Sequence, residues 1–187
     1  MPKVDRRIRK TKEAIQIALM ELLGEKEFEH ITIHDISAKA DLNRGTLYLH
    51  YADKYDLLEQ SIHDHLTRML DYCILSDVDE RGTDFVGSPL PLFQYLEDQF
   101  LFFSSMLHNK GIDCFKERLA SMVRSGLTER FKHRELHGEA KQEVTIEFLT
   151  NAFVGVVEWW VKNNMPYPPQ EMANQVRAIF ETNLSPR

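Results

Sequence analysis

Hydrophobic residues recur three and four positions apart through most of the 187 residues, which is the period of an amphipathic α-helix. The first such stretch predicts a helix from about Arg7 to Leu23, ended by Gly24. Its expected buried stripe is Ile8, Ala14, Ile15, Ala18, Leu19, Leu22 and Leu23. Phe28, in the loop that follows, is expected to fill the same core.

Two short helices joined by a tight turn are expected next. Thr32 and Asp35 have the three-residue spacing of a capping box, which starts the first of them. Asp41 stands where such a turn needs a residue that tolerates positive φ. Asn43 is a suitable N-cap for the second helix. The segment therefore has the pattern of a helix-turn-helix.

The second of these helices, from Arg44 to about His50, carries an unusual set of polar groups. Leu47 and Tyr51, four residues apart, are expected to anchor its inner face. The groups left outside belong to Arg44, Gly45, Thr46, Tyr48 and His50. Their side chains can hydrogen-bond to phosphates or base edges, and the glycine lets the backbone approach a duplex closely. A solvated polar helix face is the alternative interpretation of the same residues.

The helix after this one has an unfavourable charge in its first turn. Asp53 is expected to cap it, with Asp56 at its third position and Lys54 between them. A lysine there opposes the helix dipole. A lysine at this position is favourable if its ammonium and the helix N-terminus together face an external anion such as phosphate.

One unbroken run within residues 8–58 contains these features: Thr-Ile-x-x-Ile-Ser-x-x-Ala-x-Leu-Asn-Arg-Gly-Thr-Leu-Tyr-x-His-Tyr-x-x-Lys. It resembles the DNA-binding signature of the TetR/AcrR family of bacterial transcriptional regulators. The resemblance implies an all-α protein, with a three-helix helix-turn-helix DNA-binding domain at 1–53 and a helical regulatory and dimerisation domain at 54–187. It implies phosphate contacts for Thr32, Tyr48, His50 and Lys54, and base contacts for Arg44, Gly45 and Thr46.

The sequence departs from the family pattern at three positions. Asp41 replaces the usual glycine of the turn, and Asn43 replaces the commoner serine cap. Both substitutions are physically tolerable. Tyr51 replaces a phenylalanine, and its hydroxyl needs a hydrogen-bond partner if the ring is buried.

The net charge of −6 does not argue against DNA binding, because the charge is segregated. Residues 1–55 hold ten basic and nine acidic side chains, which leaves −7 for the rest of the chain. Six basic residues lie within the first twelve positions: Lys3, Arg6, Arg7, Arg9, Lys10 and Lys12. A basic arm leading into a helix-turn-helix predicts contact with the DNA backbone or minor groove, although solvated termini can have the same composition.

The remainder of the chain also has helical periodicity, interrupted by Pro-rich and Gly-rich segments. The expected elements are a fourth helix from Asp53 through Cys73, a loop from Ser76 to Pro91, and helices over Leu92 to His108, Ile112 to about His133, Glu139 to Asn164 and Gln170 to about Asn183. The last two helices of two subunits are expected to pair as a four-helix bundle. Trp159 and Trp160 point about 100° apart on a helix, so one of them should face a partner or a pocket.

The many Phe and Met residues in this part suit an apolar cavity, although a filled core predicts the same composition. The resemblance implies a small apolar or amphipathic ligand. The expected ligand-binding residues are Met69, Cys73, Phe100, Phe103, Phe115, Met122 and Trp159.

Several other classes of protein are disfavoured. No long apolar run or signal-peptide pattern is present, so a cytoplasmic protein without a membrane span is expected. Cys73 and Cys114 are expected to be reduced thiols in helical cores. No catalytic motif is present, so we expect neither an enzyme nor a cofactor. The histidine pairs 30/34 and 133/137 have metal-ligand spacing but lack a third ligand, so no metal site is expected.

The sequence therefore predicts a homodimeric repressor that binds double-stranded DNA at a palindromic operator and is released by a small molecule. In this hypothesis the ligand moves the fourth helix as a lever and changes the spacing of the two DNA-binding domains. The alternative is a helical adaptor that keeps the fold but acts as a protein-binding coactivator. An acidic C-terminal domain and exposed aromatic residues such as Trp159 would suit that role.

Overall fold

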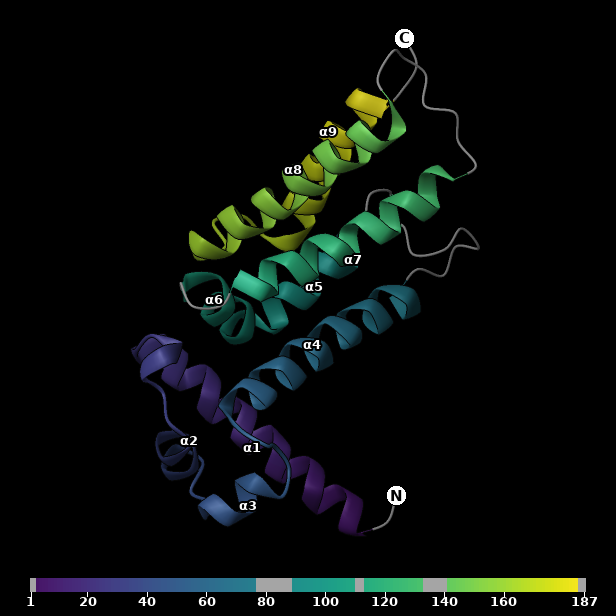
Figure 1. The fold of residues 1–187 in the computed structure, drawn as a ribbon. Coiled ribbons are helices and arrows are strands. Elements are labelled where there is room, and N and C mark those ends of the chain that lie inside the picture. The colour runs from purple at the N-terminus through teal and green to yellow at the C-terminus, as the bar shows by residue number, and fades with distance from the viewer. Residues whose placement is uncertain (1–2, 77–88, 110–112, 133–140, 185–187) are drawn as a thin grey trace.

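The computed structural model describes residues 3–76, 89–109, 113–132 and 141–184, and these residues form helices and turns without a strand. Two parts are stacked on each other (Figure 1), and α4 runs from the lower part into the upper one. The all-α prediction is confirmed. The elements are α1 (Lys3–Glu25), η1 (Phe28–His30), α2 (Ile33–Lys39), α3 (Arg44–Tyr48), α4 (Lys54–Ser76), α5 (Leu90–Asp98), α6 (Phe100–His108), α7 (Asp113–Phe131), α8 (Gln142–Lys162) and α9 (Pro169–Leu184).

The lower part is a small helical domain whose core is made by the inner face of α1. Ile15 and Leu19 of α1 are fully buried, and Phe28 is buried with them as predicted. The helix starts at Lys3, earlier than expected, and residues 6–10 are all exposed. The prediction that Ile8 is buried was wrong, since 44% of its surface is exposed. Helical periodicity marks a face but does not say how far a neighbouring element extends along it.

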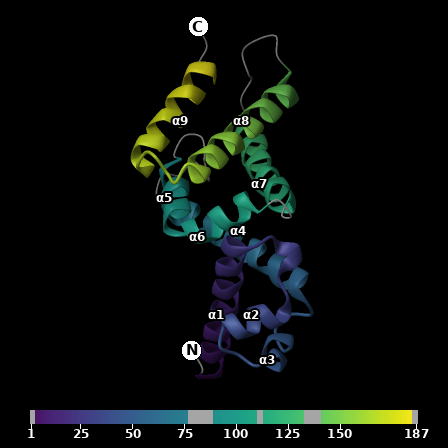
Figure 2. The same cartoon turned by 90° about the vertical axis from the view of Figure 1, so that its left-hand side faces the viewer.

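The upper part contains a bend that the sequence did not predict. The continuous helix expected from Leu92 to His108 is two helices, α5 and α6, separated by Gln99 with φ −109° and ψ 29°. The bend has a packing reason, because α5 packs mainly on α4 and α9 while α6 packs mainly on α1 and α8. One straight helix could not reach both sets of partners (Figure 2). The first of the two helices begins at Leu90, two residues before the expected start.

The two adjacent tryptophans of α8 have opposite environments, as predicted. Trp160 is fully buried, packs edge-on against Phe93 at 5.1 Å and donates its indole N–H to the carbonyl of Tyr167 at 2.8 Å. Trp159 is 46% exposed. By length and composition α8 is the one described helix that could cross a membrane. The structure buries 39% of its apolar window, with Trp160 and Phe153 in the core.

Hydrogen bonds between α6 and the lower part join the two parts directly. Ser105 donates its hydroxyl to the carbonyl of Met20 at 3.1 Å. Asn109 donates its side-chain amide to the carbonyl of Lys26 at 3.2 Å and accepts from the backbone N–H of Phe28 at 3.2 Å. These three hydrogen bonds attach α6 and its C-cap to α1, η1 and the residues between them.

The two cysteines of the upper part have opposite environments. Cys73 is buried as expected, but Cys114 is exposed near the start of α7, so the prediction of a core position for it was wrong. Most of the expected loop from Ser76 to Pro91, and the histidine pair 133/137, lie outside the described residues.

Candidate nucleic-acid interface

The start of α2 is set by a capping box. The Thr32 hydroxyl accepts the backbone N–H of Asp35 at 3.2 Å, and the Asp35 carboxylate accepts the N–H of Thr32 at 2.9 Å. Lys26 also donates to this carboxylate at 2.8 Å. The hydrogen bonds from Lys26 and then from Thr32 hold the pKa of Asp35 well below its usual range. Asp35 therefore stays ionised and orients α2 against α1.

The turn between α2 and α3 has the expected chemistry. Asp41 has φ 53°, the left-handed region that its short polar side chain tolerates. The backbone N–H of Leu42 returns to the carbonyl of Ser37 at 2.9 Å and closes the turn. Asn43 then caps α3 by accepting the N–H of Gly45 at 2.9 Å. Both departures from the family pattern in this turn are accommodated without a change of geometry.

Helix α3 directs its polar side chains outward. Leu47 is fully buried and anchors the helix. Arg44, Gly45 and Tyr48 are exposed, while Thr46 and His50 are half-buried. Within the described residues, the side chains of Arg44 and Tyr48 make no hydrogen bond or ion pair. The structure thus brings the five predicted residues together on one short, exposed segment.

Leu49 also belongs to this surface and was missed by sequence reasoning. It is 80% exposed, the largest exposed fraction among the described large hydrophobic residues. A signal was present, because Leu47 and Leu49 are two positions apart and cannot lie on the same helix face. An apolar side chain here can contact the methyl group of a thymine in the major groove.

Lys54 lies in the first turn of α4 as predicted, but its ammonium is already engaged. It donates to the carbonyls of Phe28 and Glu29, both at 3.0 Å, and lies 4.7 Å from the centre of the Phe28 ring. These contacts stabilise the end of η1 and oppose the unfavourable dipole interaction of a lysine in a first turn. The proposed phosphate contact of Lys54 stays a prediction.

Two open hollows extend this surface along the helices. One, of about 400 Å³, is lined by residues that include Arg6, Arg7 and Lys10 of α1. The other, of about 350 Å³, is lined by residues that include His34 and Arg44. Both contain Leu42 in their walls, so they are neighbours. The basic residues of the first turns of α1 and Arg44 at the start of α3 therefore line adjacent hollows.

Tyr51 places a polar hydroxyl in the apolar core of the lower part. Its side chain is 2% exposed, and its hydroxyl has no hydrogen-bond partner among the described residues. Burial, together with the carboxylates of Asp64 and Asp56, raises the pKa of Tyr51 to about 12. The ring still packs well, with the Lys12 ammonium 5.5 Å from its centre. The family's usual phenylalanine would avoid this buried polar group.

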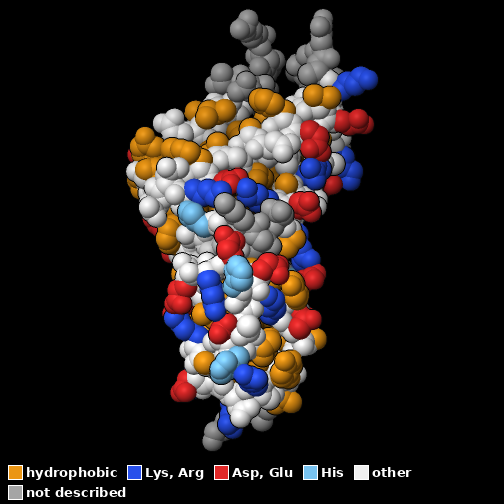
Figure 3. All heavy atoms as spheres, turned by 60° about the vertical axis from the view of Figure 1, so that its left-hand side comes forward, with side chains coloured by type: hydrophobic (Ala, Val, Ile, Leu, Met, Phe, Trp, Pro, Cys, Tyr) orange, Lys and Arg blue, Asp and Glu red, His pale blue; other side chains and the backbone are white. Residues whose placement is uncertain are grey.

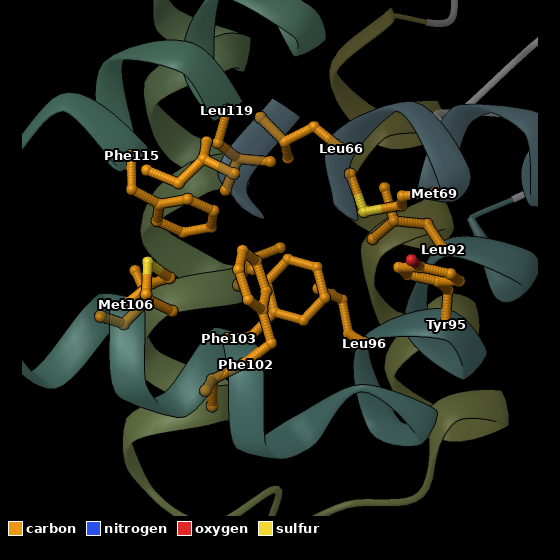
Figure 4. Close-up of a cluster of buried hydrophobic side chains, with 14 of the residues drawn as sticks. Leu66, Met69, Leu92, Tyr95, Leu96, Phe102, Phe103, Met106, Phe115 and Leu119 are labelled. Carbon is orange, nitrogen blue, oxygen red and sulfur yellow. The ribbon is translucent and has the colours of Figure 1, made fainter. Parts of the chain in front are cut away.

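The predicted ligand-binding residues are only partly brought together. Met69, Cys73, Phe103 and Phe115 are buried, and Phe100 and Met122 are half-buried. Figure 4 shows Met69, Phe103 and Phe115 in a cluster whose aromatic rings pack against one another, with the Phe103 and Phe115 ring centres 5.9 Å apart. Trp159 is exposed and lies outside this cluster, beside Tyr167 at 6.2 Å.

Two family profiles cover most of the chain. The one described as "Bacterial regulatory proteins, tetR family" matches residues 17–60, which include α2 and α3. The one described as "Transcriptional regulator C-terminal region" matches residues 89–182, half of the chain. The chain belongs to the TetR family of bacterial transcriptional regulators. The resemblance inferred from the helix-turn-helix is confirmed.

Known TetR-type proteins share this fold at low sequence identity. The uncharacterized HTH-type transcriptional regulator YxbF of Bacillus subtilis (strain 168) is 24% identical over 180 residues, which are 92% of this chain and 45% of YxbF. The chain thus spans less than half the length of that relative. A TetR transcriptional regulator from Streptococcus agalactiae 2603V is 22% identical with a TM-score of 0.70, covering 94% of this chain and 96% of that one. NalD, the secondary repressor of the MexAB-OprM multidrug efflux pump in Pseudomonas aeruginosa, is 20% identical with a TM-score of 0.67, over 95% and 98% of the two chains.

Membership of this family favours a transcriptional regulator over an enzyme or a helical adaptor. TetR-family regulators are transcription factors and not enzymes, as predicted. The helical adaptor interpretation gains no support from these similarities.

Proposed function

We propose that this TetR-family protein is a cytoplasmic, homodimeric repressor that binds a palindromic operator and is released by a small molecule. The observation that carries the proposal is the exposed polar surface of α3. Its outward side chains, above all Arg44 and Tyr48, are held by a capped helix-turn-helix and engage no partner within the described residues. An exposed and unpartnered set of donors on a rigid short helix suits contact with base edges in a major groove.

The individual contacts follow from position on this surface. Arg44, Gly45 and Thr46, at the start of α3, would face base edges. Thr32, Tyr48, His50 and Lys54 would hold phosphates on either side. Lys54 keeps one ammonium hydrogen beyond the two that it gives to η1. The basic first turns of α1 would lie along the backbone or in the neighbouring minor groove.

A dimer would place two such surfaces on one operator. In α8, Val144, Phe148 and Trp159 are 61%, 66% and 46% exposed, and Ala152 and Gly155 are exposed between them. Their spacing of four, four, three and four residues places them on one helix face. A side-chain carbon added to Gly155 would meet no atom within 4 Å. This stripe, with exposed Ile179 of α9, suits close packing of the same helices from a second subunit. Figure 3 shows hydrophobic side chains gathered along the outer edge of the upper part.

Release by a ligand would use the connection between the two parts. In this proposal a ligand enters the region of Met69, Phe103 and Phe115 and displaces α4. Because α4 begins beside α3, the displacement would change the separation of the two recognition helices. The separation can be measured between spin labels on the two α3 helices. If a ligand weakened operator binding without changing this separation, the lever mechanism would be refuted.

The primary test is selection of DNA from a random duplex library with purified protein, followed by binding at several salt concentrations. The expected result is a palindrome bound by two subunits, with affinity falling steeply as salt rises. Arg44→Ala should relax preference at particular bases. Lys54→Ala should weaken binding to all sequences and lower by about one the slope of log affinity against log salt concentration.

Matched controls are available on the upper part, where Arg177→Ala and Lys141→Ala remove the same charges from exposed positions. Neither control should change the selected sequence or the salt slope. Failure of a folded dimer to enrich any duplex would refute the proposal and favour a protein-binding role. An equal loss on every sequence from Arg44→Ala would refute base contact by that residue. A reporter gene placed behind the selected operator then decides between repression and activation.

A further inference from the structure

A hollow of about 260 Å³ lies where the lower and upper parts meet, between α1, α4 and the bend that joins α5 to α6. We call it the junction hollow; its walls include Ile17, Met20, His65, Arg68, Asp98 and Phe102. The hollow borders the aromatic cluster through Phe102, whose ring centre lies 5.1 Å from that of Phe103 and 5.9 Å from that of Phe115, but neither Phe103 nor Phe115 lines the hollow. We propose that the junction hollow binds a small apolar zwitterion, a molecule of amino-acid size with one ammonium, one carboxylate and a hydrocarbon side chain.

The wall on the side of α4 and α6 includes a buried polar group without a partner. His65 is 9% exposed and its ring stacks on Phe102, with centres 3.8 Å apart and planes 16° apart. Its Nδ1 atom is buried and forms no hydrogen bond within the described residues. Burial lowers the pKa of His65 to about 4, with the Arg68 charge acting in the same direction. The imidazole is therefore neutral at pH 7, and it adds no charge to the site.

The charged groups of the hollow are of opposite sign and are not paired with each other. Arg68 and Asp98 both line it and both are exposed, yet neither forms a hydrogen bond or ion pair within the described residues. Glu13, which also lines it, is compensated by Arg9 at 3.5 Å. One cation and one anion thus remain for a ligand. A carboxylate can bind the planar guanidinium of Arg68 through two parallel hydrogen bonds, and an ammonium can bind Asp98.

The remaining walls are apolar and incompletely covered. Met20 and Phe102 are buried beside the hollow, while Ile17 and Leu101 are 53% and 48% exposed and also line it. A hydrocarbon side chain placed between them would remove apolar surface from water on both sides. At about 260 Å³ the hollow is smaller than the roughly 300–1,000 Å³ of sites for drug-sized ligands, so it suits a molecule as small as a single amino acid.

The position of this site would make its occupant a regulator, and that consequence rests on the proposed function. A bound molecule would contact α1 of the DNA-binding part and α6 of the regulatory part at the same time. The same two helices are joined by the hydrogen bond from Ser105 to Met20. Filling the hollow would therefore favour one relative position of the two parts over others.

Methionine methyl groups provide a local test on the full-length protein. The protein is labelled with ¹³C at its methionine methyl groups and titrated with L-leucine and with L-phenylalanine. The Met20 resonance should shift and saturate, while those of Met69 and Met106 in the aromatic cluster should not. Two analogues of leucine, 4-methylpentanoate without the ammonium and 3-methylbutylamine without the carboxylate, should bind at least about tenfold more weakly.

The variants Arg68→Gln and Asp98→Asn should each weaken binding of the amino acids by about ten- to hundredfold. Arg177→Gln and Asp71→Asn change the same residue types at exposed positions outside the hollow and should leave binding unchanged. Three outcomes would each overturn the proposal: no Met20 shift, shifts at Met69 and Met106 instead, or binding of either analogue as tight as that of leucine. None of these measurements uses DNA, so failure of the operator selection with an intact Met20 response would refute the proposed function alone.

Discussion

The imidazole of His65 should make the stability of this protein depend on pH in the mildly acidic range. The side chain is 9% exposed and stacked on Phe102, and Tyr95 donates its hydroxyl to the His65 carbonyl at 3.2 Å. Burial lowers the pKa of His65 from 6.5 to about 4. The unfolded chain therefore takes up the proton at a higher pH than the folded chain does. Stability is unaffected well above pH 6.5 and falls as the pH drops towards 4.

The size of the effect follows from these two pKa values. Linkage between proton binding and unfolding gives a loss of about 2 kcal/mol in the free energy of unfolding between about pH 7 and pH 5. The charged groups nearest the ring act in opposite directions, since Arg68 lowers the pKa of His65 and Asp64 raises it. Urea unfolding of the wild type at a series of pH values, at one protein concentration, measures the loss directly.

The variant His65→Gln removes the titrating group and should reduce the pH dependence by about 2 kcal/mol over the same interval. Its stability at neutral pH can change for packing reasons, so the quantity compared is the slope of the free energy of unfolding against pH. His63→Gln, two residues away on the exposed face of α4, is the matched control and should keep the wild-type slope. If His65→Gln and the wild type lost equal stability between the two pH values, burial of a neutral imidazole would not be the cause.

Three further predictions use the same unfolding assay or a mass measurement. Tyr51→Phe should not destabilise the protein and should gain up to about 1 kcal/mol, because the buried hydroxyl has no partner; a loss of that size would show that a partner exists. Thr32→Ala should lower the free energy of unfolding by about 1 kcal/mol through loss of the capping box, whereas Thr32→Ser, which keeps the hydroxyl, should retain most of that stability; equal losses in both variants would exclude capping as the reason. Phe148→Asp should convert a dimer to a monomer in light scattering while Ser121→Asp on α7 should not, and a dimeric Phe148→Asp variant would exclude the α8 stripe as the interface.

The helix-turn-helix was predictable because its determinants are local. Each cap joins groups two or three residues apart, as in Thr32 with Asp35 and Asn43 with Gly45. The positive φ of Asp41 is a property of one residue in a tight turn. Such interactions depend on spacing along the chain, so sequence alone specifies them. The resemblance to a known signature added the roles of the outward residues, which spacing does not give.

The errors concern contacts between residues far apart in the chain. The bend at Gln99 results from the need of α5 and α6 to meet different partners, and an apolar run contains no mark of where it must turn. Cys114 is exposed, although cysteine is a residue type that is often buried in a core. The hydrogen bonds from Lys54 to two carbonyls of η1, about 25 residues earlier, are likewise a long-range contact that no local pattern shows, and the phosphate contact of Lys54 stays a prediction. Periodicity shows which face of a helix is apolar but not which neighbour covers it.

By itself the sequence determined the helical class, the capped helix-turn-helix and the family, because these depend on periodicity and on side chains a few positions apart. Only the tertiary structure decided that Trp160 is buried and Trp159 is exposed, and that the aromatic cluster excludes Trp159. It alone placed His65, Arg68 and Asp98 around one hollow. These features arise when helices α1, α4, α5 and α6 pack together, and packing is set by the whole set of buried surfaces and not by any single segment.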